Sequence, residues 1–158
     1  MLKNILSASA CEQCRICCEY DDSDIWDAPG FSEDEWQEAG LEGRFPYEKR
    51  GSLYYLVMEK DEKGLYHCPC LSDTGCILGE HKPFRCALWP LYVVRTGDGL
   101  ALAVSDVCPA VFPKTDAEIL EGLRDNLPRI RKAVEKDSAL IEELHENYRL
   151  LAGSDRIV

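Results

Sequence analysis

The sequence has 158 residues, 46% of them hydrophobic and 30% charged, which is typical of a soluble globular chain of one domain. Its net charge of −11 disfavours binding to nucleic acid or to an anionic membrane. No apolar run approaches the ~18–20 residues of a membrane span, and the pair Ile5-Leu6 is far shorter than the ~7–15 apolar residues of a secretion signal. We therefore expect a cytoplasmic protein, whose thiols stay reduced and available to metals.

Four cysteines stand within eight residues near the N-terminus: Cys11, Cys14, Cys17 and Cys18. Thiolates are the soft, charged ligands that zinc and iron–sulfur clusters prefer, and the C-x2-C-x2-C run is also that of bacterial ferredoxins. Cys17 and Cys18 are adjacent, so their side chains diverge and we expect them to serve different sets of ligands. The alternatives are a disulfide framework or buried apolar cysteines. The odd total of nine cysteines disfavours a closed framework, and such dense clustering disfavours the second alternative.

The residues after this cluster predict a loop, a short helix and an irregular stretch. Residues 19–30 are acidic and end in Pro29-Gly30, as loops do. Ser32 and Glu35 form a capping-box pattern, which predicts a helix over 32–39 closed by Gly40. Residues 41–51 contain two glycines and one proline and predict irregular structure.

Two hairpins are predicted next. Residues 53–58 are apolar and aromatic, and after a turn at 61–64 residues 65–67 would return as a second strand and deliver Cys68 to the site. Residues 91–95 and 100–104 predict the second hairpin, around a turn at 96–99. We expect the two hairpins to form one small antiparallel sheet.

The C-terminal third predicts helices. Thr115 and Glu118 form a second capping-box pattern, and apolar residues then recur every three or four positions up to residue 151. Pro128 predicts a break near 126–128, and Gly153 ends the last helix. This stretch contains no cysteine, so we expect residues 115–152 to support a cysteine-rich core spanning 11–110, within one α+β domain of 1–158. A partner-binding helix face is the alternative role of such a stripe.

A second group of cysteines lies in the middle of the chain. Its members are Cys68, Cys70, Cys76 and Cys86, with Cys108 following the second hairpin. Gly75 and Pro83 are turn formers that can aim thiols inward, and the N–H groups of such turns stabilise thiolates. A proline directly after a ligand cysteine, as in Cys108-Pro109, is found in ferredoxin-type clusters.

Residues 11–110 resemble the YkgJ-type CxxCxxCC proteins, which are described as zinc- or iron-chelating domains. The CxxCxxCC run carries the resemblance, and Cys68 with Leu71 matches the family's C-x-x-L segment. The family stretch C-x-I-Y-E-x-R-P-x-x-C-R-x-F-P is matched more loosely, by Cys76, Glu80, Pro83, Cys86, Trp89 and Pro90, and Cys108 matches a late cysteine. Gly79, Lys82 and Ala87 depart from that pattern, so only the sulfur ligands are carried over.

The matching thiols suit two four-ligand sites, or one cluster and one ion. The spacing suggests one centre held by Cys11, Cys14, Cys17 and Cys108, and another held by Cys18, Cys68, Cys76 and Cys86. We expect Cys70 to be a small buried residue rather than a spare ligand. His67 is interpreted as structural rather than metal-binding, His81 as a loop residue between ligands, His145 as a residue of a solvated helix, and Glu80 as a surface residue.

Three functions follow from these patterns. The first is an iron–sulfur protein, with a cluster such as [4Fe–4S] that passes electrons to a redox partner protein or senses redox state. The second is a zinc-binding structural or adaptor module. The third is an enzyme, either a component of an Fe–S oxidoreductase or a modifying enzyme, because a related domain is associated with flagellin lysine methylation in some bacteria. The sequence shows no nucleotide-binding or hydrolase motif and leaves catalytic residues and oligomeric state open.

Overall fold

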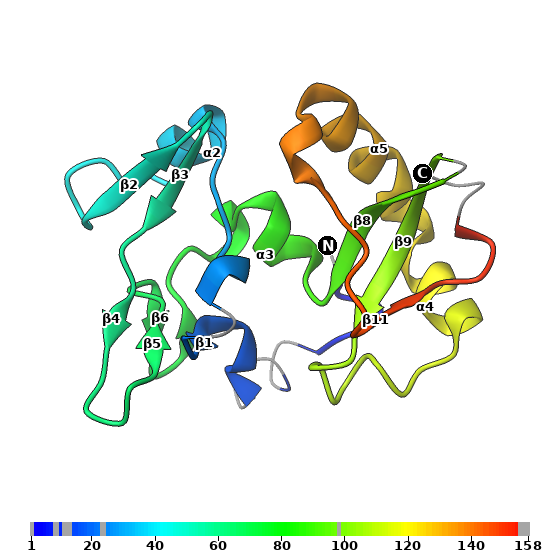
Figure 1. Ribbon diagram of the computed structural model, residues 1–158, viewed down its shortest axis with the longest axis horizontal. Helices are drawn as coiled ribbons and strands as arrows, with labels where there is room; N and C mark the ends of the chain where they lie inside the picture. Colours follow the sequence, from blue (N-terminus) through cyan, green and yellow to red (C-terminus); the bar gives the residue numbers. More distant parts are fainter. Residues whose placement is uncertain (1, 8–9, 11–13, 23–24, 98, 155–158) are drawn as a thin grey trace. The chain divides into compact units, whose positions relative to one another are not determined.

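The computed structural model describes residues 2–7, 10, 14–22, 25–97 and 99–154, and it has an α+β fold (Figure 1). The chain divides into two compact units. The cysteine-rich unit comprises Cys11–Ala87, and the sheet-and-helix unit comprises Met1–Ala10 together with Leu88–Val158. The compact cysteine-rich part therefore ends at Ala87 and not at residue 110, and Cys108 belongs to the other unit.

Short elements make up the cysteine-rich unit. In chain order they are η1 (Ile16–Cys18), β1 (Glu19–Tyr20), η2 (Ile25–Asp27), α2 (Glu33–Glu38), β2 (Tyr47–Arg50), β3 (Leu53–Leu56), β4 (Glu59–Lys60), β5 (Tyr66–His67), β6 (Leu71–Ser72), β7 (Gly75–Cys76), η3 (Gly79–His81) and α3 (Phe84–Leu88), whose last residue crosses into the next unit. The strands form three small antiparallel sheets, ordered β1-β5-β4, β2-β3 and β6-β7.

The predicted helix at 32–39 is confirmed. Ser32 caps α2, and both halves of its capping box with Glu35 are present. Three acidic residues in the first turn complement the positive end of the helix dipole. Gly40 follows the end of the helix with a φ of +60°, a left-handed conformation that glycine adopts without strain.

The predicted first hairpin is wrong in its pairing. Strand β3 does not pair with residues 65–67 but with β2, which lies in the stretch predicted to be irregular. The turn at 61–64 instead joins β4 to β5. All four residues of β2 are exposed, so this strand lacks the apolar alternation by which a half-buried strand is recognised.

The core of this unit is aromatic and includes cysteine. Its buried residues are Phe31, Trp36, Leu41, Tyr54, Leu56, Cys70 and Leu78. The ring of Trp36 stacks on that of Tyr54, with centroids 5.2 Å apart, and Phe31 meets it edge-on at 5.6 Å. Cys68 and Cys76 pack against this cluster, so two of the predicted ligands stand at the edge of the core.

The sheet-and-helix unit is built on the second predicted hairpin. Strands β8 (Leu91–Thr96) and β9 (Gly99–Ser105) pair antiparallel, as predicted. They form the centre of a sheet ordered β10-β8-β9-β11, in which β10 (Ile141–Glu142) runs parallel to β8 and β11 (Tyr148–Leu150) antiparallel to β9. The expectation that both hairpins share one sheet is wrong, because this sheet contains none of the strands β1 to β7.

Helices α4 (Asp116–Leu123) and α5 (Leu127–Lys136) lie along this sheet in Figure 1. Thr115 caps α4 with the predicted capping box, and the break predicted at Pro128 is confirmed, because η4 (Arg124–Asn126) separates the two helices. Pro128 stands in the first turn of α5, where its missing N–H costs nothing.

The predicted last helix is wrong: the described chain from 137 to 154 contains η5 (Ser138–Leu140) and strands β10 and β11 instead. The side chain of Asp137 accepts a hydrogen bond from the N–H of Ala139 and so caps the start of η5. Across the described residues, no helix has the length and apolar character needed to cross a membrane.

Candidate metal centre

Four cysteines from four short elements carry the candidate site, and we call them the four-cysteine set: Cys18, Cys68, Cys76 and Cys86. Cys18 ends η1, Cys68 directly follows β5, Cys76 ends β7 and Cys86 lies in α3. Residues far apart in the sequence are thus brought into one unit. The set is the same as the second of the two ligand groups predicted from spacing.

The backbone joins the first two of these cysteines. Strand β1 pairs with β5, with Glu19 opposite His67, and the N–H of Cys68 continues the ladder by donating to the carbonyl of Cys18 at 2.9 Å. The expectation that residues 65–67 deliver Cys68 to the site is therefore supported, although the partner strands are β1 and β4.

A tight hairpin adds the third cysteine. Strands β6 and β7 place Cys76 opposite Leu71, and the N–H of Ile77 donates to the carbonyl of Cys70 at 2.9 Å. The turn at 73–74 leads into Gly75, the first residue of β7, which has a φ of +101° and so occupies a region that side-chain-bearing residues avoid. The expected role of Gly75 as a turn former is confirmed, and the hairpin holds residues 68–71 beside 76–77.

Electrostatic interactions link the thiols of the set. Burial raises the pKa of Cys86 well above its usual value, and charge on Cys68, Cys18 and Cys76 raises it further. The pKa of Cys76 is raised by burial and by Cys18 and Cys68. A hydrogen bond with Cys70, then burial, raise that of Cys68, to which Cys18 also contributes. Each thiol would therefore meet the charge of the others if the set ionised.

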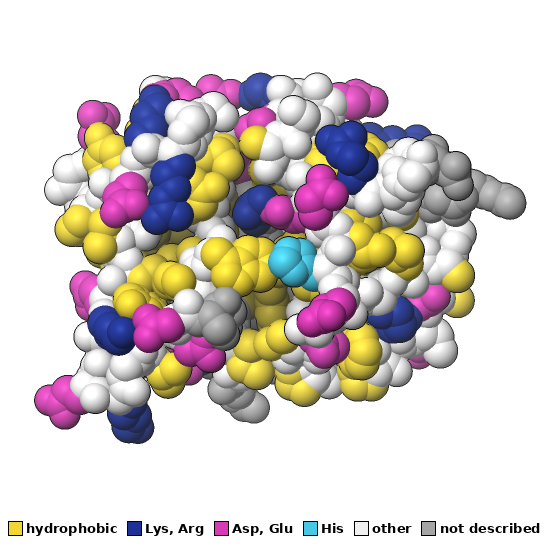
Figure 2. Space-filling model, viewed as in Figure 1, with side chains coloured by type: hydrophobic (Ala, Val, Ile, Leu, Met, Phe, Trp, Pro, Cys, Tyr) yellow, Lys and Arg dark blue, Asp and Glu magenta, His cyan; other side chains and the backbone are white. Residues whose placement is uncertain are grey.

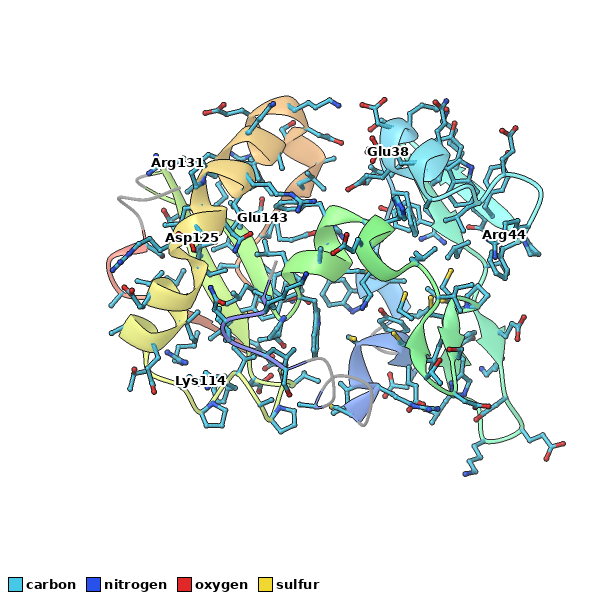
Figure 3. All side chains as sticks on the ribbon, turned by 180° about the vertical axis from the view of Figure 1, so that it is seen from behind. Glu38, Arg44, Lys114, Asp125, Arg131 and Glu143 are labelled. Carbon is cyan, nitrogen blue, oxygen red and sulfur yellow. The ribbon has the colours of Figure 1, made fainter. Side chains whose placement is uncertain are left out.

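Two backbone N–H groups point at sulfur atoms of the set. The N–H of Cys70 donates to the sulfur of Cys68, and that of Leu78 to the sulfur of Cys76; each opposes the rise in pKa of its thiol. In both cases the donor lies two residues after the cysteine. Hydrogen bonds of this kind stabilise thiolate charge and tune a bound metal. Figure 3 shows sulfur atoms gathered between the blue segment that contains β1 and the green strands of the same unit.

These thiols are suited to a cation rather than to nucleophilic chemistry. A reactive cysteine needs a lowered pKa, whereas the pKa values of Cys68, Cys76 and Cys86 are raised, Cys68 first by a hydrogen bond with Cys70 and the other two first by burial. A bound metal cation would lower the pKa of these thiols, because it compensates for the charges of all its thiolate ligands at once. Thiolates are the ligands that zinc and iron–sulfur clusters prefer, so metal binding by this set stays a prediction. Among the described residues, no group of three or more His, Cys, Asp or Glu side chains lies so that it could hold a metal ion.

The other predicted ligands are less completely placed. Cys11 lies outside the described residues. The side chains of Cys17 and Cys18 do not diverge as expected, because their sulfur atoms are 3.9 Å apart. Cys14 is half-buried in the same segment. Cys108 is buried in the sheet-and-helix unit. The grouping of these cysteines around a first centre therefore remains a prediction. The described cysteines all have free thiols, so they form no disulfide framework.

The remaining candidates take structural roles. Cys70 is fully buried, as predicted. His67 is bound between carboxylates, with its Nε2 3.0 Å from Asp61 and its Nδ1 3.8 Å from Glu19. His81 and Glu80 lie exposed in η3. His145 is exposed as predicted, but it lies outside any helix, with its ring 5.3 Å from that of Tyr148.

One neighbour of the set was not predicted from sequence. Tyr20 is buried, and its hydroxyl donates to the carbonyl of Cys17 at 2.8 Å. Burial raises its pKa far above the usual value, and charge on Cys86, Cys17, Cys18 and Cys68 raises it further. Tyr20 therefore remains neutral beside the thiols. A tyrosine near the start of the acidic stretch 19–30 gives no sequence signal for this position.

No protein-family model, curated protein or solved structure matches this chain. The resemblance to YkgJ-type proteins therefore remains a prediction based on the cysteine pattern.

Proposed function

We propose that the cysteine-rich unit binds metal through the four-cysteine set, and that the bound group is an iron–sulfur cluster used for electron transfer or redox sensing. The observation that supports this proposal is electrostatic: charge on Cys18 raises the pKa of Cys68, Cys76 and Cys86, and charge on Cys68 raises that of Cys76 and Cys86. Cysteine thiolates are the usual ligands of such clusters. The C-x2-C-x2-C run that leads into Cys18 adds to the likeness to ferredoxins.

The protein's own residues would hold and tune the cluster. The four-cysteine set would supply the ligands, and the N–H groups of Cys70 and Leu78 would donate to two of the sulfurs. Hydrogen bonds to sulfur and exclusion of water are the means by which a protein sets the potential of a cluster. The core beside Cys68 and Cys76, together with Tyr20, would keep water out. When bound, the cluster would supply one-electron chemistry.

A structural zinc site is the second candidate, and the short elements favour it. The strands of the cysteine-rich unit are two to four residues long, and its helices have at most six residues. Small folds with so little regular structure commonly depend on a metal for stability. Four thiolates close a tetrahedral zinc site completely, leaving no open position for chemistry.

One preparation separates the two candidates. We would purify the protein without oxygen, record its visible spectrum, and count iron, zinc and acid-labile sulfide per chain. A brown protein with matching iron and sulfide supports the cluster, and a colourless protein with bound zinc supports the structural site. A wild-type chain that takes up neither metal would overturn both.

We also propose that the protein exchanges electrons with a partner protein. On the face seen in Figure 2, acidic side chains are interspersed with basic ones, so no single patch of one charge marks a docking surface there. The net charge of −11 favours a basic partner through long-range attraction. Association that slows as salt is added would be the sign of such a partner.

A further inference from the structure

The carboxylate of Glu35 joins the starts of two helices. Its Oε2 atom accepts hydrogen bonds from the N–H and the hydroxyl of Ser32, both at 2.9 Å, which completes the capping box of α2. Its Oε1 atom accepts a hydrogen bond from the N–H of Phe84 at 2.6 Å. One side chain therefore fixes the start of α2 and, 49 positions further along the chain, the start of α3.

The second of these contacts acts on the segment that carries Cys86. Phe84 is the first residue of α3, and the N–H groups of a first helical turn have no partner within the helix. Glu35 supplies that partner two residues before Cys86. Phe84 itself is buried, and the N–H of Ala87 donates to the carbonyl of Pro83 at 2.9 Å, so the turn is held on both sides of Cys86.

We propose that Glu35 is a positioning residue for the metal centre, which aligns Cys86 with the other members of the four-cysteine set through its hydrogen bond to Phe84. This inference rests on the proposed metal binding. Because α3 has only five residues, its own hydrogen bonds define its direction weakly, and an outside acceptor at its start decides where the Cys86 thiol lies.

The chain contains a matched control for this role. Glu118 makes the same capping-box contacts as Glu35, accepting from the N–H of Thr115 at 2.8 Å and from its hydroxyl at 2.7 Å. It belongs to the sheet-and-helix unit, in a segment without any member of the four-cysteine set. Replacement of Glu118 by Gln therefore weakens a capping box without touching α3.

The experiment uses Co²⁺ as the probe, added without oxygen to the full metal-free chain. Thiolate ligation gives a sulfur-to-cobalt charge-transfer absorption, and its decay after addition of a chelator gives the rate of metal release. We would compare wild type with Glu35→Gln, Glu118→Gln and Ser32→Ala. Gln offers one acceptor oxygen and one NH2 donor, so it cannot accept from Ser32 and Phe84 on two separate atoms.

We expect Glu35→Gln to release cobalt about tenfold faster than wild type and to shift the charge-transfer band, as loss of a contact behind a metal ligand does. Ser32→Ala and Glu118→Gln should lose stability but keep the wild-type band and release rate. A Glu35→Gln protein with the wild-type band and rate would overturn the positioning role while leaving the metal site intact.

A second variant covers the case in which Glu35→Gln fails to fold. Glu35→Asp keeps the charge but is one methylene shorter, so it cannot span both Ser32 and Phe84; we expect the same change in band and rate. Equal behaviour of Glu35→Asp and wild type would count against the inference. If wild type gives no charge-transfer band at all, the proposed metal binding itself falls, and the role of Glu35 falls with it.

Discussion

The members of the four-cysteine set and Cys70 differ in the surroundings of their thiols. Members of the four-cysteine set are half-buried and act on one another by charge, and Cys68 and Cys76 pack against the core. Cys70 is fully buried among Phe31, Trp36 and other apolar residues of that core, and its N–H and thiol both contact Cys68. One buried cysteine thus packs the core and hydrogen-bonds to Cys68.

This difference predicts the outcome of alanine substitutions. Replacing any member of the four-cysteine set should leave less than about a tenth of the wild-type metal bound after exposure to a chelator, because three thiolates leave the centre open. Cys70→Ala should keep the wild-type metal content but lower the stability by about 1 kcal/mol, as core substitutions commonly do. Metal analysis and urea unfolding give the two quantities. Loss of metal from Cys70→Ala would make Cys70 a ligand.

A close contact in the sheet-and-helix unit gives a second prediction at this scale. A Cβ atom added at Gly122 in α4 would lie 2.4 Å from Cγ1 of Ile5, a buried residue of the N-terminal segment. Gly122→Ala should therefore destabilise the protein by about 1–3 kcal/mol through overpacking.

The same substitution should act differently once the contact is removed. In an Ile5→Ala background Gly122→Ala should become neutral or stabilise by up to about 1 kcal/mol, because alanine is the better helix former. Urea unfolding of the two single variants and the double variant measures this coupling. Equal effects of Gly122→Ala in both backgrounds would mean that Ile5 does not pack against α4.

At the scale of elements, the capping box of α4 makes the stability of the protein depend on pH. Hydrogen bonds from the hydroxyl and N–H of Thr115 hold the pKa of Glu118 below its usual value. A lowered pKa in the folded state means that Glu118 contributes stability above its unfolded pKa of about 4.3, and that this contribution disappears as pH falls through the lower, folded pKa.

Thr115→Ala should therefore be less stable than wild type at neutral pH, and the difference should shrink as pH falls from about 6 to about 3. Thermal unfolding of both proteins across this interval measures the gap, and processes that the two share, such as protonation of thiols, cancel in the comparison. A gap that stays constant down to pH 3 would exclude a role for Glu118 charge.

Local signals made some elements predictable, and their absence made others unpredictable. Both capping boxes, the β8–β9 hairpin and the break before α5 follow from short patterns that need no distant partner. Strand β2 consists wholly of exposed residues, and β10 becomes a strand through parallel pairing with β8, which joins Ile141 to Val93. The apolar spacing of 141, 144, 148 and 151 fits a helix as well, and only the long-range pairing decides against it.

The candidate site was predictable in part for the same reason. Thiol chemistry and spacing predict the ligand residues and their grouping, because cysteine is rare outside metal or redox roles at such density, and both stay predictions. The positions of Tyr20 and Phe84 relative to the thiols depend on the β1–β5 pairing and on the contact of Glu35 with Phe84. Contacts between segments so distant in sequence leave no local pattern.

At the scale of the whole molecule, the two units should respond differently to metal. Each has a core of its own: the aromatic cluster around Trp36 in one, and Tyr92, Val94, Ala101 and Ala103 in the other. Metal removal should therefore reduce protection from amide hydrogen exchange mainly in β1, β5, β6 and β7. Protection in β8 and β9 should change little, because their hydrogen bonds lie within a sheet without any of the proposed ligands.

Exchange measured by mass spectrometry on metal-loaded and metal-free protein tests this expectation. The Cys86→Ala variant serves as a control, since it should resemble the metal-free wild type without any chelator. A uniform loss of protection over both units would show that they unfold together and that metal stabilises the whole chain.

The order of the units along the chain has a consequence for biosynthesis. The cysteine-rich unit is inserted between the first ten residues and the rest of the sheet-and-helix unit. Leu2 and Ile5 are buried, and Ile5 packs against a helix that is translated roughly 10 s later at typical ribosomal rates. During that interval every member of the four-cysteine set has already been translated. If the proposed metal site exists, its ligands are thus complete on the growing chain before the N-terminal segment can pack against α4.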